Sequence, residues 1–177
     1  KTRGLVSAAP TSNIEASDVY RSSRQSVEKR AIAAAAAAFV EPGQSIFFDD
    51  STTVLQMVPQ LQARVPLTAI TNSLTLMNAR RLRADQVFLS VAAITDDMLF
   101  HQSPDMVESK RAMFESAKRR VLLADHTKFE RRALHGMGRL DEFDAIIVDA
   151  NLPSADVLKM RSRGLNVIVA PWHPVIS

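Results

Sequence analysis

Short apolar runs alternate with longer amphipathic stretches along most of the chain. The runs have the length of strands buried on both faces of a sheet, and the longer stretches have the spacing of helices that cover those faces. We expect strands at residues 46–48, 67–70, 87–91, 121–124, 145–148 and 166–170, and helices at residues 26–39, 52–61, 74–81, 103–118 and 154–163. This alternation predicts an α/β fold: a mostly parallel sheet with helices on both faces.

Several predicted helices have recognisable ends. Ser103 is a good N-cap, Pro104 suits the first helical position, and the acid at Asp105 complements the helix dipole. The alanine-rich helix that starts near residue 26 is stopped by Pro42 and Gly43. Residues 1–25 mix Ser, Thr, Pro and charges without sustained periodicity, so we expect a linker or arm there, followed by one domain over residues 26–177.

Composition narrows the class of protein. The 177 residues are 46% apolar and 23% charged, which is typical of an ordinary soluble globular domain. No apolar run has the length of a membrane span, and the N-terminus lacks the apolar core of a signal peptide. The absence of cysteine excludes disulfides and cysteine zinc sites. Together these features favour a reducing, cytoplasmic setting, although lack of cysteine alone would also suit an exported protein. The net charge is only +3, and the basic residues are scattered along the chain. No motif in the chain would recognise DNA by itself.

Polar residues gather where three predicted strands end, at residues 49–53, 71–73 and 125–128. The carboxyl ends of parallel strands meet at one edge of a sheet, beside helix N-termini that favour anions. Hydroxyls and a lysine at that edge would suit a phosphate, and carboxylates would accept from sugar hydroxyls. The candidate ligand-binding residues are Asp49, Asp50, Ser51, Thr52, Thr53, Thr71, Asn72, Ser73 and Lys128. Each loop alone could be a simple helix cap or turn, but the three together favour a site for a phosphorylated small molecule.

Other polar residues give weaker signals. The four histidines lack the spacing of metal ligands, and we predict no metal and no cofactor. His126 is the histidine that falls in a candidate site loop. Glu108 and Lys110 lie two apart on a predicted helix, so one of them is expected to face the site and the other solvent.

Several motifs, in this order, resemble the C-terminal sensor domain of DeoR-type bacterial transcriptional regulators. They are an alanine-rich helix after Lys29, Pro42-Gly43, Ile-Phe-Phe-Asp-x-Ser-Thr-Thr at 46–53, Ile-Thr-Asn-Ser at 70–73, Val-Phe-Leu-Ser-Val at 87–91, Glu108-x-Lys110, and Ala-Asp-x-Thr-Lys-Phe at 124–129. The resemblance implies the fold of ribose-5-phosphate isomerase and glucosamine-6-phosphate deaminase. It also implies a phosphorylated sugar or related metabolite as effector, with Lys128 as the phosphate partner. The implied protein is a cytoplasmic regulator, expected to be a repressor, that forms a homodimer or homotetramer and binds DNA through an N-terminal winged helix.

The chain departs from the family pattern in three places. Ser51 stands where the family usually has glycine, which disfavours a positive φ at that position. The segment between Leu82 and Val87 is too short for the further strand and Gly-Gly excursion of the family, so either this protein lacks them or the sequence omits them. The winged helix is absent, and residues 1–5 resemble the tail that leaves it, which suggests the sensor part of a longer regulator.

Two rival functions remain open from the sequence. One is an isomerase or deaminase on the same fold, which needs a carboxylate that moves a proton between carbons; the candidates are Asp49, Asp50, and Asp96 or Asp97. The other is an oligomerisation domain whose pocket has decayed, which the Ser51 change and the short segment would favour.

Overall fold

The protein is described by a computed structural model in which residues 24–71 and 82–171 are placed. Within that part of the chain the main sheet has six strands in the order β2-β1-β3-β6-β8-β9, and every neighbouring pair is parallel. The strands are β1 (Ser45–Phe48), β2 (Thr68–Thr71), β3 (Ala84–Leu89), β6 (Ala117–Ala124), β8 (Ala145–Val148) and β9 (Val167–Val169). The predicted α/β class with a mostly parallel sheet is therefore confirmed.

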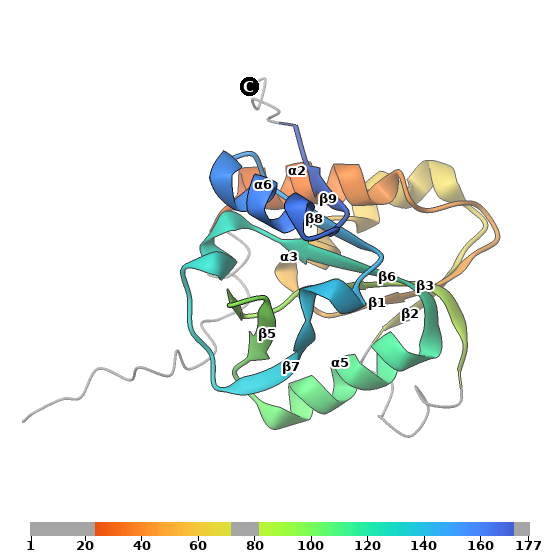
Figure 1. The fold of residues 1–177 in the computed structure, drawn as a ribbon. Helices are drawn as coiled ribbons and strands as arrows, with labels where there is room; N and C mark the ends of the chain where they lie inside the picture. The colour runs from red at the N-terminus through yellow and green to blue at the C-terminus, as the bar shows by residue number, and fades with distance from the viewer. Residues whose placement is uncertain (1–23, 72–81, 172–177) are drawn as a thin grey trace, which may run out of the picture.

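Helices cover both faces of this sheet, as predicted (Figure 1). On one face the alanine-rich α2 (Ser26–Ala37) packs closely on the sheet, with Ile32 fully buried, next to the short α3 (Thr52–Leu55) and the 3₁₀ helix η1 (Val58–Arg64). On the other face lie α5 (Pro104–Ser116) and α6 (Ser154–Ser162). Because strand residues alternate between faces, β1 sends Ile46 and Phe48 to the α2 side and Phe47 to the α5 side.

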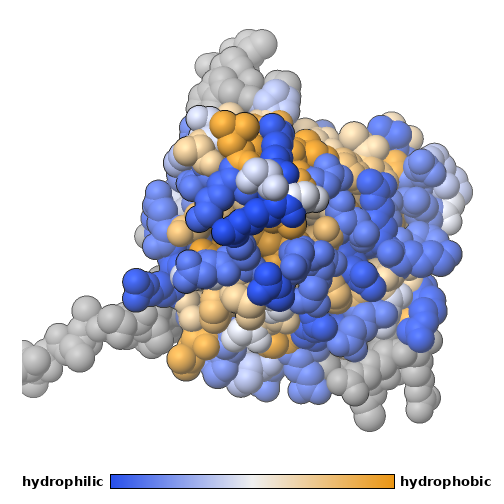
Figure 2. All heavy atoms as spheres, viewed as in Figure 1, coloured by the Kyte–Doolittle hydropathy of each residue, from blue (hydrophilic) through white to orange (hydrophobic). Residues whose placement is uncertain are grey.

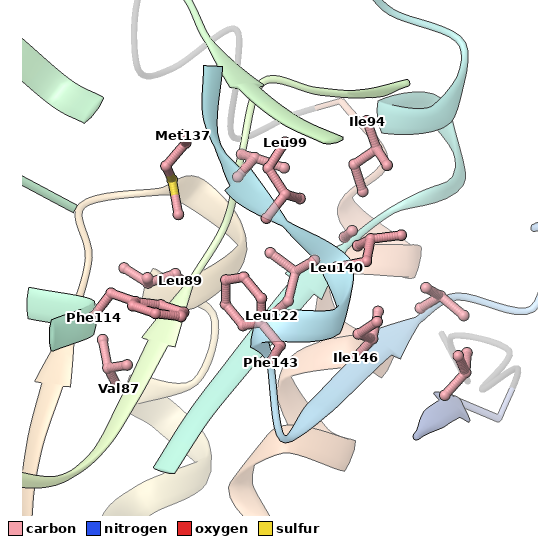
Figure 3. Close-up of a cluster of buried hydrophobic side chains, with 14 of the residues drawn as sticks. Val87, Leu89, Ile94, Leu99, Phe114, Leu122, Met137, Leu140, Phe143 and Ile146 are labelled. Carbon is pink, nitrogen blue, oxygen red and sulfur yellow. The ribbon is translucent and has the colours of Figure 1, made fainter. Parts of the chain in front are cut away.

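A second, three-stranded antiparallel sheet was not predicted from the sequence. It consists of β4 (Ala93–Thr95), β5 (Met98–His101) and β7 (His135–Arg139), in the order β4-β5-β7. Its hairpin turns at Asp96 and Asp97, both at positive φ, which is the geometry of a two-residue turn between antiparallel strands. Leu99 and Met137 of this sheet pack with Phe114 and Leu122 in one core cluster (Figure 3). The 3₁₀ helix η3 (Leu140–Glu142) follows β7 and adds Leu140 to the same core.

Some predicted helices change in extent. The helix expected over residues 52–61 is one α-helical turn followed by the 3₁₀ helix η1, because Pro59 has no N–H to continue an α-helix. Ser103 stands at the N-cap of α5, as expected, but its side chain makes no capping hydrogen bond. Gly164 at φ 85 follows the end of α6, where the left-handed region favours glycine. The helix predicted at residues 74–81 lies outside the described residues.

Most of the surface in the view of Figure 2 is hydrophilic, with apolar side chains visible between the polar ones. None of the described helices combines the length and the apolar character needed to cross a membrane.

Candidate functional site

The strand order changes direction between β1 and β3: the chain runs from β1 to β2 on one side and then crosses to β3 on the other. In open α/β sheets the crevice beyond the carboxyl ends of the strands at such a switch point is the usual ligand site. The buried carboxylate of Asp49 ties this point together. It accepts hydrogen bonds from Ser51 N (2.8 Å), from Ser90 N (2.7 Å) and from Lys110 Nζ (2.5 Å).

A polar cavity opens at this switch point, and we call it the polar cavity throughout. Its volume is about 210 Å³. Residues 50–53 and 90–92 line it from the ends of β1 and β3, and residues of α2, β5, α5 and the segment after β6 close it. Residues that are far apart in the sequence therefore converge there, as the predicted sheet edge required.

The loop after β1 brings hydroxyl groups to the polar cavity. Asp50, Ser51, Thr52 and Thr53 all line it. Ser51 is the N-cap of α3, and its Oγ accepts a hydrogen bond from Val54 N at 3.2 Å. Its φ of −67° is ordinary for any residue, so the serine in place of the family's glycine causes no backbone strain here.

Lys128 also lines the polar cavity. It lies in the 3₁₀ helix η2 (His126–Phe129), which the side chain of Asp125 caps by accepting a hydrogen bond from Thr127 N. The Lys128 side chain is 15% exposed, and its Nζ lies 4.0 Å from Asp125 Oδ2. Burial lowers the pKa of Lys128, and the Asp125 charge only partly opposes this effect. An ammonium so enclosed and so loosely paired would gain from an anion in the cavity.

Further charged and polar groups complete the lining. Lys29, a buried residue of α2, and Arg131 add basic side chains to the polar cavity. Lys110 is the member of the Glu108 and Lys110 pair that faces the site, whereas Glu108 is exposed. His101, from β5, also lines the cavity, and burial together with the Lys110 charge lowers its pKa to about 4.

Of the remaining predicted site residues, Asp49 and Thr71 are not among the residues that line the polar cavity. Asp49 is 1% exposed and its carboxylate is engaged by protein donors, so it supports the loop and is not available to sugar hydroxyls. Thr71 lines a separate apolar groove beside Val54, Leu61 and Ala69, and does not line the polar cavity. Asn72 and Ser73 lie outside the described residues.

His126, the histidine in a candidate site loop, has a structural role. The His126 ring is held by Asp149, with Nδ1 3.0 Å from Oδ1, and is not among the residues that line the polar cavity. Within residues 24–71 and 82–171, no cluster of three or more His, Asp or Glu side chains is placed to bind a metal ion.

Sequence reasoning missed several lining residues, among them Lys29, Ser90, His101 and Arg131. A signal existed for Lys29, because helical spacing puts it on the same face as the buried Ile32, Ala33 and Ala36. No comparable signal existed for His101, because its strand belongs to the sheet that the sequence did not predict.

The family model of the DeoR C terminal sensor domain matches residues 24–81 and 74–150. This chain belongs to that family. The resemblance stated from the motifs is thus confirmed, and the chain is the sensor domain of a DeoR-type transcriptional regulator.

Relatives of this sensor domain are named as transcriptional repressors. A putative aga operon transcriptional repressor of Escherichia coli O157:H7 is 25% identical over 198 residues, covering 93% of this chain and 74% of the relative. The glycerol-3-phosphate regulon repressor of Escherichia coli K12 is 26% identical over 179 residues, covering 82% and 71%. The first alignment is longer than this chain, so the relative has residues that this sensor domain lacks, and the two family matches overlap at residues 74–81, close to the short segment noted in the sequence.

Solved structures share the fold of this DeoR-type domain. The delta subunit of eIF2B from Chaetomium thermophilum matches with a TM-score of 0.50 and 16% identity, over 73% of this chain and 58% of that one. Ribose 5-phosphate isomerase from Methanocaldococcus jannaschii aligns less well, with a TM-score of 0.46 and 17% identity over 57% of this chain and 53% of that one.

Proposed function

We propose that this sensor domain binds a phosphorylated sugar or related phosphorylated metabolite in the polar cavity, and that binding controls the DNA affinity of the whole regulator. The observation that carries the proposal is the Lys128 ammonium, which lines the same cavity as the hydroxyl-bearing loop 51–53 and lies 4.0 Å from its carboxylate partner. A phosphate would supply the missing negative charge and accept hydrogen bonds from the hydroxyls.

The charged side chains that line the polar cavity favour an anionic ligand. Five basic side chains line it, from Arg24, Lys29, Lys110, Lys128 and Arg131. Two carboxylates, Asp50 and Asp125, line it as well, and Asp49 lies directly behind Lys110 as its ion-pair partner. Basic side chains therefore outnumber carboxylates in the lining, which favours an anionic ligand such as a phosphate monoester.

The placement of the acids favours a sensor over an enzyme. Isomerisation needs a carboxylate that reaches the carbon chain of the ligand. Of the acids considered from the sequence, Asp49 is buried in its ion pair, and Asp96 and Asp97 form the β4–β5 turn and do not line the polar cavity. Asp50 remains, exposed and without a partner base in a recognised catalytic pattern. The presence of an open cavity likewise speaks against a decayed pocket.

The name of one relative is consistent with a phosphorylated effector. One relative is a repressor of a glycerol-3-phosphate regulon, and its name contains a phosphorylated metabolite. A ligand in the polar cavity would shift the population of a dimer or tetramer between two arrangements, provided that it binds one of them better. DNA would be bound by an N-terminal winged-helix domain of the full regulator.

A thermal-shift screen of phosphorylated sugars tests the proposal. A ligand at 100 times its Kd adds about 2.7 kcal/mol, which for a domain of this size raises Tm by roughly 5–10 °C. Lys128→Met should abolish the shift, while Lys159→Met on the exposed face of α6 should leave it unchanged. Equal shifts in the wild type and Lys128→Met would place the ligand elsewhere, and no shift across a broad panel would refute the proposed effector class.

A further inference from the structure

His101 lines the polar cavity, and the proposed phosphate does not explain its chemistry. It lies at the end of β5, held by the second sheet through Leu99, which is two residues earlier on the same strand and fully buried. The charges that act on its ring belong to Lys110, Asp49, Asp50 and Lys128, so the ring stands among the groups of the site.

The ring of His101 has an unpaired nitrogen. Its Nδ1 is enclosed and finds no hydrogen-bond partner among the described residues. An enclosed N–H without an acceptor costs more than an enclosed lone pair without a donor, so the proton of the neutral ring belongs on Nε2. Because Nδ1 is shut off, Nε2–H is the ring group left for a ligand in the cavity.

The neutral state of His101 suits contact with an uncharged part of the ligand. Burial and the neighbouring lysine ammoniums disfavour the imidazolium, so at neutral pH the ring adds no charge to attract the phosphate. Asp50 lies close enough for its charge to act on the ring and lines the same cavity. A donor on His101 and an acceptor on Asp50 together match a hydroxyl group, which both donates and accepts.

We propose that His101 is a specificity-determining residue, whose Nε2–H donates a hydrogen bond to a hydroxyl or carbonyl oxygen on the carbon chain of a phosphate ester. This inference rests on the proposed function, since it assumes that the phosphate occupies the Lys128 side of the same cavity. The site would then select polyhydroxylated phosphate esters over phosphate groups that lack an oxygen-bearing chain.

The test is a selectivity ratio measured by titration calorimetry. The probes are methyl phosphate, which presents only the charged group, and the tightest binder among ribose 5-phosphate, glucose 6-phosphate and glycerol 3-phosphate. The ratio of the two Kd values should fall about tenfold in His101→Phe, which removes the donor and keeps a flat ring. His101→Gln, whose amide N–H reaches near the Nε2 position, should keep most of the ratio, and His101→Asn, which is too short, should lose it.

Two controls separate the roles in the site. His135 pairs with His101 in the β5–β7 register but does not line the polar cavity, so His135→Phe should change neither Kd. Lys128→Met should weaken both probes and leave their ratio unchanged.

Each outcome decides a different question. An unchanged ratio in His101→Phe and His101→Asn, or an equal loss for both probes, would overturn the role of His101 and leave the phosphate site standing. If His101→Phe does not fold, the Gln and Asn pair carries the comparison. If the wild type binds neither probe, this inference fails, and the thermal-shift screen over the broad panel decides whether the proposed function fails with it.

Discussion

Substitution of either partner of the buried ion pair between Lys110 and Asp49 should lower the free energy of unfolding more than other changes at the site. The two side chains are 1% and 0% exposed, and Nζ lies 2.5 Å from Oδ2. Removal of one partner from such a pair leaves an uncompensated buried charge, which typically costs about 3–5 kcal/mol. In Lys110→Met the remaining carboxylate keeps its hydrogen bonds from Ser51 N and Ser90 N, so we expect a loss near the lower limit, about 3 kcal/mol.

Asp49→Asn should cost more than Lys110→Met. It leaves a buried ammonium without its counter-charge and weakens the attachment of the loops that carry Ser51 and Ser90. Chemical denaturation at neutral pH without ligand measures both losses, and a loss of about 3 kcal/mol corresponds to a Tm decrease of roughly 6–12 °C for this chain length.

A surface ion pair provides the matched control. Lys118 Nζ lies 3.5 Å from Asp85 Oδ1, and the side chains are 81% and 39% exposed. Lys118→Met makes the same chemical change in a solvated setting, so it should cost less than about 1 kcal/mol. If Lys110→Met were as mild as Lys118→Met, or if Asp49→Asn were the milder of the two changes at the buried pair, the account of Asp49 as the residue that ties the site together would be wrong.

Three further results are expected from the same stability assay. Lys128→Met should stabilise the ligand-free protein, because burial lowers the pKa of Lys128 and its charged form therefore opposes folding. This penalty is fully present below the folded pKa and fades as pH rises through it toward the unfolded value of 10.5; a less stable variant would contradict the prediction. The His101 pKa of about 4 lies below its unfolded value of 6.5, so the unfolded state takes up a proton first as pH falls. The free energy of unfolding of the wild type should therefore decrease by about 2 kcal/mol, after allowance for partial exposure, between pH 6.5 and pH 4. His101→Gln should not show this part of the decrease. Ser51→Ala should cost about 1 kcal/mol through loss of the cap on Val54 N, and an unchanged midpoint would show that the cap contributes nothing.

The parallel sheet could be predicted from the sequence because its strands are buried on both faces and appear as uninterrupted apolar runs. The antiparallel sheet could not. Its strand β7 contains Gly136 and Gly138, which weaken a strand pattern, and its hairpin turns through Asp96-Asp97 in place of a glycine turn. These strands form because β5 pairs with its neighbours and Leu99 is buried in the core, and such long-range contacts leave no local pattern.

The same contrast applies to the polar cavity. The loop 50–53 and Lys128 were found because their positions follow from strand ends alone. Lys29 and His101 were missed because they reach the cavity from a covering helix and from the second sheet, whose placement depends on packing across the whole domain.

Three strand ends show why an acid after a strand says little about ligand contact in this fold. Asp49, Asp125 and Asp149 follow β1, β6 and β8, each is 1% exposed, and each accepts a hydrogen bond from the backbone N–H two residues later. In this local turn the carboxylate accepts a hydrogen bond from the backbone and so shapes the loop.

The third residue after each of these acids has a different use. After Asp49 it is Thr52, and after Asp125 it is Lys128; both line the polar cavity. After Asp149 it is Leu152, which is buried in the core. The turn is therefore common to the three loops, and the side chain three positions after the acid decides whether the loop lines the polar cavity or contributes to the core. For the same reason, the carboxylates of Asp49 and Asp125 act mainly to shape the loops that bring Thr52 and Lys128 to the polar cavity.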